Sequence, residues 1–318
     1  MKRHGNLWNK IIDMDNLLLA HKNARKGKSK YKAVKLVDEN VQRYCEEIRK
    51  MLVNKTFTTS EYDMFIKNDR GKEREIYKLP YYPDRIIQHA IMQVLEPIWK
   101  STLIADTYQS IKGRGVHKVL PKVVKAVQQD NIEYCLKMDV QKFYPSINKD
   151  IMKKVVRRKI KCKDTLWLLD NIINSSVNGL PIGNYISQYL GNLYLSELDH
   201  KVKEEIGVKY YYRYCDDIIV LAQSKKELHS IRSYVNLELQ NVKLVLKQDY
   251  RVYPTIQGVD VLGYIVSKSK VKVRSNVKQN MILNYSKRNT SSYDGILKHC
   301  DCNRLKNKLK RKLDDTIS

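Results

Sequence analysis

The sequence predicts an α+β fold, in which helices accompany short antiparallel strands. Helical periodicity recurs along much of the chain, and two segments carry strand-like runs on either side of a turn, as hairpins do. A hydrophobic content of 42% with only seven Pro and 12 Gly argues against disorder. At 318 residues the chain is long enough for two or three subdomains with a real core.

The chain begins with a predicted helical segment, residues 1–55. Its apolar residues recur at steps of three and four, as they do at Val41, Tyr44, Ile48 and Leu52. A polar loop, NARKGKSK, interrupts it. Residues 57–78 follow with two alternating runs around NDRGK, which predicts a hairpin whose turn is at Asp69, Arg70 and Gly71.

Helices and strands then alternate along the chain. Apolar stripes predict six helices. They lie at 83–99, from about 116 to 128, after 147 up to about 159, near 164–175, from 184 to about 205 and near 225–240. A strand is predicted at 135–147, from which the chain leaves at Pro145. Further strands are predicted at 242–247 and 261–266. No internal repeat is evident.

The charge balance predicts a polyanionic partner. Lys and Arg number 60 against 34 Asp and Glu, a formal net charge of +26 with a pI near 9.6. Nucleic acid is favoured over a membrane, because no apolar run approaches the ~18 residues of a spanning helix and no signal peptide is evident. We expect a cytoplasmic protein that binds nucleic acid and no membrane.

The six cysteines show no paired CxxC spacing, so reduced thiols are expected. His299, Cys300 and Cys302 cluster in KHCDC, but this spacing fits no common zinc site and no second pair follows. We therefore expect no zinc centre there.

Residues 268–318 form a separate basic element. They hold 14 Lys and Arg against four Asp, a net charge of +10. Leucines at helical spacing favour a helical subdomain that presents cations on one side, rather than a solvated tail. These are Leu297, Leu305, Leu309 and Leu313.

Residues 211–222, YYRYCDDIIVLA, place two adjacent carboxylates between an aromatic run and an aliphatic run. Tyr, Val and Ile favour strands and Asp favours turns, so the string predicts a hairpin with Asp216 and Asp217 at its tip. Two like charges there repel each other, and a divalent cation would offset the repulsion. For a lone Asp pair, a solvated turn is the alternative.

A third carboxylate completes a candidate metal site. Asp139 is the only acid in the strand-like run LKMDVQKFYPSI, and a strand laid beside the hairpin would bring it to the Asp pair. Three such carboxylates can hold two Mg²⁺ ions ~3.5–4 Å apart, one activating an attacking hydroxyl and the other neutralising the leaving pyrophosphate. This is the chemistry of a polymerase.

The motifs MDVQKFY, GLPIGNYISQ, YCDD and VLGY, in this order, resemble the palm of reverse transcriptases. The resemblance implies a right-hand polymerase fold, with fingers, a palm built on an antiparallel sheet, and a short helical thumb. We accordingly expect four ranges: a helical N-terminal segment (1–55), fingers with part of the palm (56–134), the palm with the catalytic motifs (135–267) and the basic helical thumb (268–318).

The resemblance also implies roles for single residues. Asp139, Asp216 and Asp217 match the catalytic acids, and Asp139, Asp216 and the backbone carbonyl of Val140 match the ligands of two Mg²⁺ ions, for which Mn²⁺ can substitute. Tyr144 matches the aromatic gate that lies under the sugar and rejects a 2′-hydroxyl, which implies a preference for deoxynucleotides.

Further positions match substrate and nucleic-acid contacts. The nucleotide contacts are Arg74, Lys78, Tyr144, Ile182, Gly183 and Gln188, of which the first two lie in the part of the fingers that grips the triphosphate. The nucleic-acid contacts are Arg114 in KGRG, Gly263 in the turn that holds the primer strand, and Lys306, Lys308, Lys310 and Arg311 in the thumb.

Within PIGNYISQ (181–188), many reverse transcriptases carry Gln after the Pro and Pro after the Ser, where this chain has Ile182 and Gln188. This combination resembles the enzymes of diversity-generating retroelements, as do DRIIQHAIMQVLEPI, YQSIKGRGVHKV and SSYDGILKHC. The resemblance implies error-prone copying at template adenines. Physically, Ile182 offers only an apolar contact where Gln would hydrogen-bond the nascent pair.

The same resemblance implies a bacterial or phage-encoded enzyme. Its expected partners are template RNA, cDNA, dNTPs and an oligomer of a small basic accessory protein. Tyr185 departs from relatives that often have a smaller residue there, and this could shift fidelity in either direction.

Two alternatives stay open at this point. A phage-defence or retron-type bacterial reverse transcriptase would share the same palm. A non-catalytic RNA-binding protein would use the polymerase fold only as a scaffold, and the three intact aspartates weigh against that interpretation.

Overall fold

The computed structural model describes residues 2–69, 72–286 and 288–314. The chain forms two compact units and crosses between them several times. The first unit comprises Met1–Ala105, Val140–Lys201 and Leu237–Val245, and the second comprises Asp106–Asp139, Val202–Asn236 and Leu246–Ser318. The four ranges expected from the sequence stay a prediction.

The first unit opens with the predicted N-terminal helices, which are confirmed as α1 (Trp8–Ile11), α2 (Met14–Ala24), α3 (Lys32–Glu39) and α4 (Val41–Val53). Asp13 caps α2, because its carboxylate accepts hydrogen bonds from the backbone N–H groups of Asp15 and Asn16. Asn40 caps α4 by accepting from the N–H of Arg43. The buried faces of these helices make α2 pack on α4 and on α5 (Ile86–Lys100).

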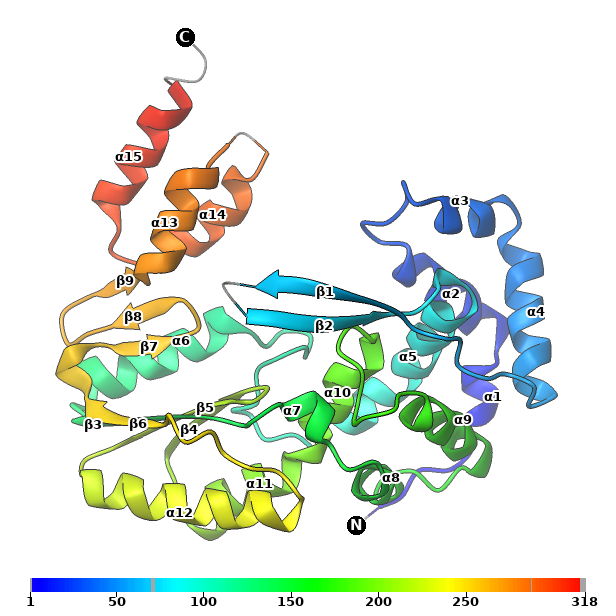
Figure 1. Cartoon of the computed structure of the whole chain (residues 1–318), viewed down its shortest axis with the longest axis horizontal. Helices are drawn as coiled ribbons and strands as arrows, with labels where there is room; N and C mark the ends of the chain where they lie inside the picture. The colour runs from blue at the N-terminus through cyan, green and yellow to red at the C-terminus, as the bar shows by residue number, and fades with distance from the viewer. Residues whose placement is uncertain (1, 70–71, 287, 315–318) are drawn as a thin grey trace. The chain divides into compact units, whose positions relative to one another are not determined.

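The hairpin predicted at 57–78 is confirmed. Strands β1 (Asp63–Asp69) and β2 (Lys72–Lys78) pair antiparallel, with Asp63 opposite Lys78 (Figure 1). Arg70 and Gly71 of the predicted turn lie outside the described residues.

The first unit also holds the helices from the middle of the chain. They are α7 (Phe143–Ser146), α8 (Lys149–Arg157), α9 (Lys163–Asn174), α10 (Tyr185–Tyr194) and α11 (Ser196–His200). An irregular turn, Tyr81–Arg85, makes α5 begin at Ile86 rather than at Pro83. The single helix predicted at 184–205 is interrupted at Leu195.

The strand predicted at 135–147 is wrong beyond Asp139. Strand β3 (Tyr134–Asp139) ends there, and Lys142 has a left-handed φ of 43° that no strand accommodates. Phe143–Ser146 then forms the short helix α7 around Pro145.

The second unit is built on a four-stranded antiparallel sheet. Its strand order is β4 (Tyr210–Tyr214), β5 (Asp217–Ala222), β3 and β6 (Arg251–Pro254). Helix α6 (Val116–Val124) continues through a turn at Lys125–Gln129 and buries Val119 and Val123 in the same cluster as Ile219 and Leu221. Helix α12 (Lys225–Asn241) follows β5.

Two strand predictions in this region are wrong. No strand forms at 242–247, because the chain turns after α12 and Lys243 has a left-handed φ of 57°. The strand predicted at 261–266 is instead a tight hairpin of β7 (Val259–Val261) and β8 (Tyr264–Val266), to which β9 (Val271–Val273) adds a third strand.

The basic C-terminal element is helical, as predicted, and contains three helices. They are α13 (Ser275–Asn284), α14 (Thr290–Leu297) and α15 (Asn303–Asp314), drawn in orange to red (Figure 1). The predicted leucine stripe is confirmed, since Leu297, Leu305 and Leu309 are buried with Met281 and Leu313 packs against them. Within the described residues, no helix combines the length and the apolar composition needed to cross a membrane.

Candidate active site

Three carboxylates meet at one end of the sheet in the second unit. Strands β3 and β5 pair antiparallel so that Asp139 lies directly opposite Asp217. Asp216 lies in the turn between β4 and β5, as the sequence predicts. The hairpin and the neighbouring strand that carries Asp139 are therefore both confirmed.

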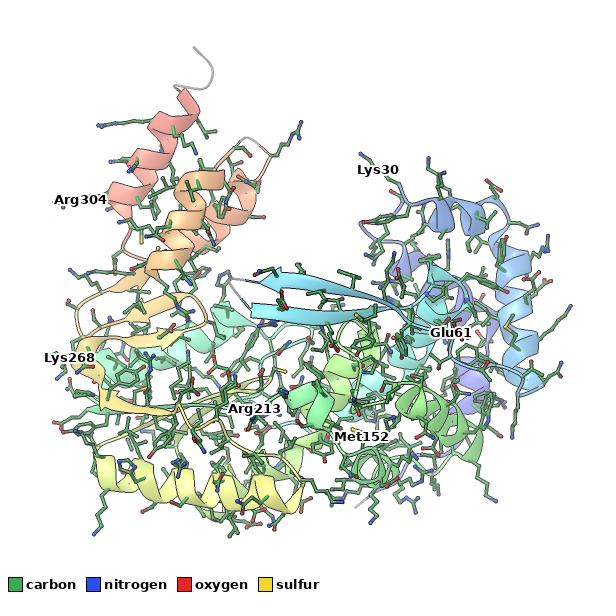
Figure 2. The ribbon with its side chains drawn as sticks, viewed as in Figure 1. Lys30, Glu61, Met152, Arg213, Lys268 and Arg304 are labelled. Carbon is green, nitrogen blue, oxygen red and sulfur yellow. The ribbon has the colours of Figure 1, made fainter. Side chains whose placement is uncertain are left out.

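Arg213 holds the turn that carries Asp216. Its side chain, labelled in Figure 2, is wholly buried, and Nη1 donates a hydrogen bond of 3.0 Å to the carbonyl oxygen of Cys215. Cys215 has a left-handed φ of 59°, which a non-glycine residue adopts only when its surroundings impose it. The sequence reasoning missed Arg213, although a charged residue inside an aromatic strand is a usable signal.

Two lysines lie against the carboxylates, and the sequence reasoning missed both. Lys247 Nζ is 2.7 Å from Asp139 Oδ1, and Lys137 Nζ is 3.5 Å from Asp217 Oδ2. Lys247 reaches this place because its backbone N–H donates to the carbonyl oxygen of Asp139 at 2.8 Å. Lys137 precedes Asp139 by two positions on β3, so both side chains share one face of the sheet.

Burial and like charge make this cluster costly to ionise. Burial raises the pKa of Asp216, and the negative charge of Asp139 raises it further. Burial also raises the pKa of Asp217 to about 6, in spite of the opposing charge of Lys137. A cation bound here would relieve both carboxylates.

The donor chemistry fits a divalent metal. Asp139 Oδ1 and Asp217 Oδ1 are buried, and within the described residues neither accepts a hydrogen bond, because Lys247 approaches Asp139 without hydrogen-bond geometry. As the side chains stand, no three or more His, Cys, Asp or Glu in the described part of the chain, Asp139, Asp216 and Asp217 included, form a group that could hold a metal ion. These three carboxylates are the residues that would hold an ion here, after a change of side-chain orientation that brings their oxygens together. A bound divalent ion would activate a primer hydroxyl and neutralise the departing pyrophosphate.

The remaining predicted metal ligand, Val140, follows Asp139 in the chain, is buried, and belongs to the first unit. All six residues predicted to contact the nucleotide also belong to that unit. These are Arg74, Lys78, Tyr144, Ile182, Gly183 and Gln188.

Tyr144 is joined to the loop that precedes α10. The backbone N–H of Leu180 donates to the carbonyl oxygen of Tyr144 at 2.9 Å. Gly191 of α10 leaves space for the tyrosine ring, since a Cβ there would lie 3.2 Å from a ring carbon of Tyr144. The ring tilts against Phe143 with a centroid separation of 5.2 Å.

The same loop is also hydrogen-bonded to the hairpin of β1 and β2. The N–H of Tyr77 on β2 donates to the carbonyl oxygen of Ile182 at 2.8 Å. Gly183 has a φ of 119°, and a Cβ on it would lie 2.4 Å from the carbonyl oxygen of Tyr77. Glycine is required at this close approach.

A cavity of about 140 Å³ lies where the loop and the hairpin meet. Its lining includes Tyr77, Lys78, Arg85, Gln88, Gly183 and Tyr185. Arg74 shares a strand face with Lys78, although it does not line the cavity. Gln188 is exposed on α10.

The residues predicted to contact nucleic acid all belong to the second unit. Arg114 is partly buried and donates to the carbonyl oxygen of Thr107 at 3.3 Å. Gly263 forms the turn between β7 and β8, with a φ of 105°. Lys308, Lys310 and Arg311 are exposed on α15, and Lys306 is partly buried there.

All six cysteines fall within the described residues and are free thiols, as the sequence predicts. Cys300 and Cys302 pack beside the leucine stripe of the C-terminal helices, so the two cysteines of KHCDC border a small apolar core.

Comparisons with known proteins show which family this chain resembles. The family profile described as reverse transcriptase (RNA-dependent DNA polymerase) matches residues 66–266. Protein YkfC of Escherichia coli strain K12 is 23% identical over 276 residues, covering 70% of this chain and 72% of that protein.

Solved structures with a similar fold include apo telomerase of Candida tropicalis, with a TM-score of 0.53 at 13% identity. That match covers 69% of this chain and 49% of the telomerase chain, so the chain spans about half the length of this relative. Apo telomerase of the same species truncated from its C-terminal domain gives a TM-score of 0.50 at 13% identity, covering 73% and 60% of the two chains. The predicted polymerase fold with antiparallel sheets is confirmed.

Proposed function

Because this chain belongs to the reverse transcriptase (RNA-dependent DNA polymerase) family, we propose that it is the polymerase of a diversity-generating retroelement, which copies a template RNA into adenine-mutagenised cDNA. The observation that carries the proposal is the segment at 181–188, with Ile182 and Gln188 in place of the commoner Gln and Pro. The segment resemblances elsewhere in the chain support it.

The geometry around Ile182 supports a role for its side chain in fidelity. The Tyr77 N–H and the glycine at 183 fix the backbone of this residue, so the loop has little freedom to re-aim the side chain. An apolar side chain cannot donate or accept a hydrogen bond. A nascent pair in contact with it would be held by shape alone, and discrimination that depends on hydrogen bonds would be lost.

In the proposed reaction, Asp139, Asp216 and Asp217 hold two Mg²⁺ ions, for which Mn²⁺ substitutes, and Val140 adds its carbonyl oxygen. Tyr144 excludes a 2′-hydroxyl, and Arg74 and Lys78 bind the triphosphate of the dNTP, for which a fork of donors is well suited. Gly263, Arg114 and the cations of α15 follow the backbone of the template and primer.

The partners we propose are template RNA, its cDNA and an oligomer of a small basic accessory protein, in the cytoplasm of a bacterium. A net charge of +26 disfavours direct contact between two basic proteins, so RNA would bridge them. RNA sequenced from the protein purified out of its host would identify the template.

The proposal is tested by extending a DNA primer on a defined RNA with Mg²⁺ and dNTPs, and by sequencing the cDNA. We expect errors opposite template adenine to exceed those opposite the other three bases. The Asp216→Asn protein, purified in the same way, controls for contaminating polymerases.

Two other results would replace the proposal. Equally low errors at all four bases would favour a phage-defence or retron-type enzyme. RNA binding without any primer extension would favour a non-catalytic RNA-binding protein.

A further inference from the structure

Lys137 lies between two carboxylates of the second unit. Its Nζ is 3.5 Å from Asp217 Oδ2 and 3.5 Å from Asp260 Oδ2, and it is 3.4 Å from the carbonyl oxygen of Asp260. Asp260 lies on β7, apart from the motifs that carry the three catalytic candidates. The ammonium group is therefore shared between Asp217 and a carboxylate with no role so far.

Asp260 is held in place from its other side. Arg274 Nη2 pairs with Asp260 Oδ1, which leaves Oδ2 on the side of Lys137. Arg274 immediately precedes α13, and its backbone N–H donates to the carbonyl oxygen of Gly263 at 2.8 Å. The start of the C-terminal helices thereby fixes the orientation of Asp260.

We propose that Asp260 is a positioning residue that keeps Lys137 from closing on Asp217, and so sets how tightly the carboxylate cluster binds a divalent metal. This inference rests on the proposed role of Asp217 at the metal site. Asp260 touches neither substrate nor metal and acts through Lys137.

The direction of the effect follows from the charges. Without the carboxylate at 260, Lys137 loses one of its two negative neighbours and moves onto Asp217. A cation paired with Asp217 repels an incoming metal ion and offsets the negative charge of the carboxylate that would bind it. Substituting a residue that orients a metal ligand without binding the metal typically changes the metal affinity by about 10- to 100-fold.

The probe is Mn²⁺, and its binding to the full-length protein without nucleotide is followed by electron paramagnetic resonance. Asp260→Asn should bind Mn²⁺ about tenfold more weakly than the wild type. Adding Lys137→Met to Asp260→Asn should restore binding to at least the wild-type level, because the competing cation is gone. Glu227→Gln, which removes an exposed negative charge from the same unit, should bind as the wild type does.

Rescue by Lys137→Met separates positioning from simple damage to the fold. If Asp260→Asn binds Mn²⁺ like Glu227→Gln, or if the double variant binds no better than Asp260→Asn alone, the inference is overturned. If Asp260→Asn does not fold, the single variant Lys137→Met tests the inference by its affinity for Mn²⁺. It should bind Mn²⁺ more tightly than the wild type, and equal or weaker binding overturns the inference.

Asp217→Asn is measured beside these variants. If it binds Mn²⁺ and extends a primer as the wild type does, the assignment of Asp217 to the metal site fails. If it loses both while Asp260→Asn resembles the control, the metal site stands and only the role of Asp260 fails.

Discussion

Asp139 and Asp217 face each other as register partners on β3 and β5, although 78 positions of sequence numbering separate them. Antiparallel pairing brings directly opposite side chains within a few ångströms, on the order of 5 Å between Cβ atoms. Two carboxylates at this spacing, with Asp216 in the adjoining turn, concentrate negative charge at one end of the sheet. This arrangement binds a small cation more favourably than three separately solvated acids would.

Asp216→Asn should abolish primer extension while RNA binding and folding stay near wild type. Losing one metal ligand normally costs several kcal/mol of transition-state stabilisation, so synthesis should fall below about 1% of wild type. Single-turnover extension in Mg²⁺ and in Mn²⁺ measures it. Asp249→Asn, an exposed acid of the same unit, is the matched control and should extend normally. Extension by Asp216→Asn above that level would refute the metal-site assignment.

Neutralising the cations of α15 should weaken RNA binding and flatten its dependence on salt. The variant changes Lys306, Lys308, Lys310 and Arg311 to Gln. Each lost phosphate contact should lower the slope of log K against log salt by roughly 0.7–0.9. Binding of one RNA duplex is titrated at several salt concentrations.

The control for α15 removes four exposed cations from two other helices. These are Arg49 and Lys50 on α4, and Lys225 and Lys226 on α12. An unchanged slope in the α15 variant would mean that this cluster faces solvent or a protein partner. An equal loss in both variants would mean that net charge alone binds RNA.

The elements that the sequence predicted well are those whose signal is local. The hairpin at Asp216 follows from residue types within a dozen positions, and the leucine stripe of α15 follows from its period. Strand β6 was missed because its pairing with β3 joins residues more than 100 positions apart. No local pattern marks a four-residue run that ends in Pro254 as a strand.

The residues of the candidate site also divide into those with a local signal in the sequence and those without one. Its aspartates lie in motifs and were predicted, whereas the lysines beside them were not. Lys247 is the last residue of a segment that was expected to be a strand and instead turns at Lys243. A role for Asp260 is evident only from its ion pair with Lys137, which lies on a separate strand. Charge pairing between distant segments is a tertiary property, and neither periodicity nor turn chemistry encodes it.

His89 should make the first unit less stable in mild acid. Burial, aided by the positive charges of Arg85 and Lys26, lowers the pKa of His89 to about 4. The unfolded chain takes up this proton near pH 6.5, so between pH 6.5 and 4 the unfolded state binds more protons and stability falls as the pH falls. The loss attributable to His89 should be roughly 3 kcal/mol.

His89→Phe should remove that loss, because the ring can still stack on Tyr185, whose centroid lies 4.2 Å away. Denaturant unfolding followed by tryptophan fluorescence at pH 7 and pH 4 gives the difference for each protein. His229→Phe, at an exposed histidine of α12, should keep the pH dependence of the wild type. A variant at 89 with the wild-type dependence would contradict the lowered pKa.

Gly183→Ala should weaken dNTP use without touching metal binding. The added Cβ meets the Tyr77 carbonyl oxygen at 2.4 Å, so the loop must move away from β2. Backbone strain of this kind costs about 1–3 kcal/mol. We expect a higher KM for dNTP and unchanged Mn²⁺ affinity, since the carboxylates belong to the other unit.

Gly27→Ala is the control for strain alone. Gly27 also has a positive φ, of 69°, but a Cβ there would meet no atom within 4 Å. It should lower stability and leave KM unchanged. Equal KM values for the two alanine variants would show that the contact between Tyr77 and this loop has no part in nucleotide binding.

Ile182→Gln should change errors opposite template adenine more than errors opposite the other bases. Gln supplies an amide that can hydrogen-bond the nascent pair, whereas isoleucine supplies only an apolar surface, and groups that hydrogen-bond a substrate discriminate far better than apolar walls do. The aspartates are unaltered, so synthesis itself should survive. The measurement is the error rate per template base in cDNA made on one defined RNA. Val177→Gln, a substitution at a side chain that is 94% exposed in the same unit, should leave the spectrum as it is in the wild type. If the wild type favours errors at adenine and Ile182→Gln retains that spectrum, the selectivity arises from a residue other than Ile182.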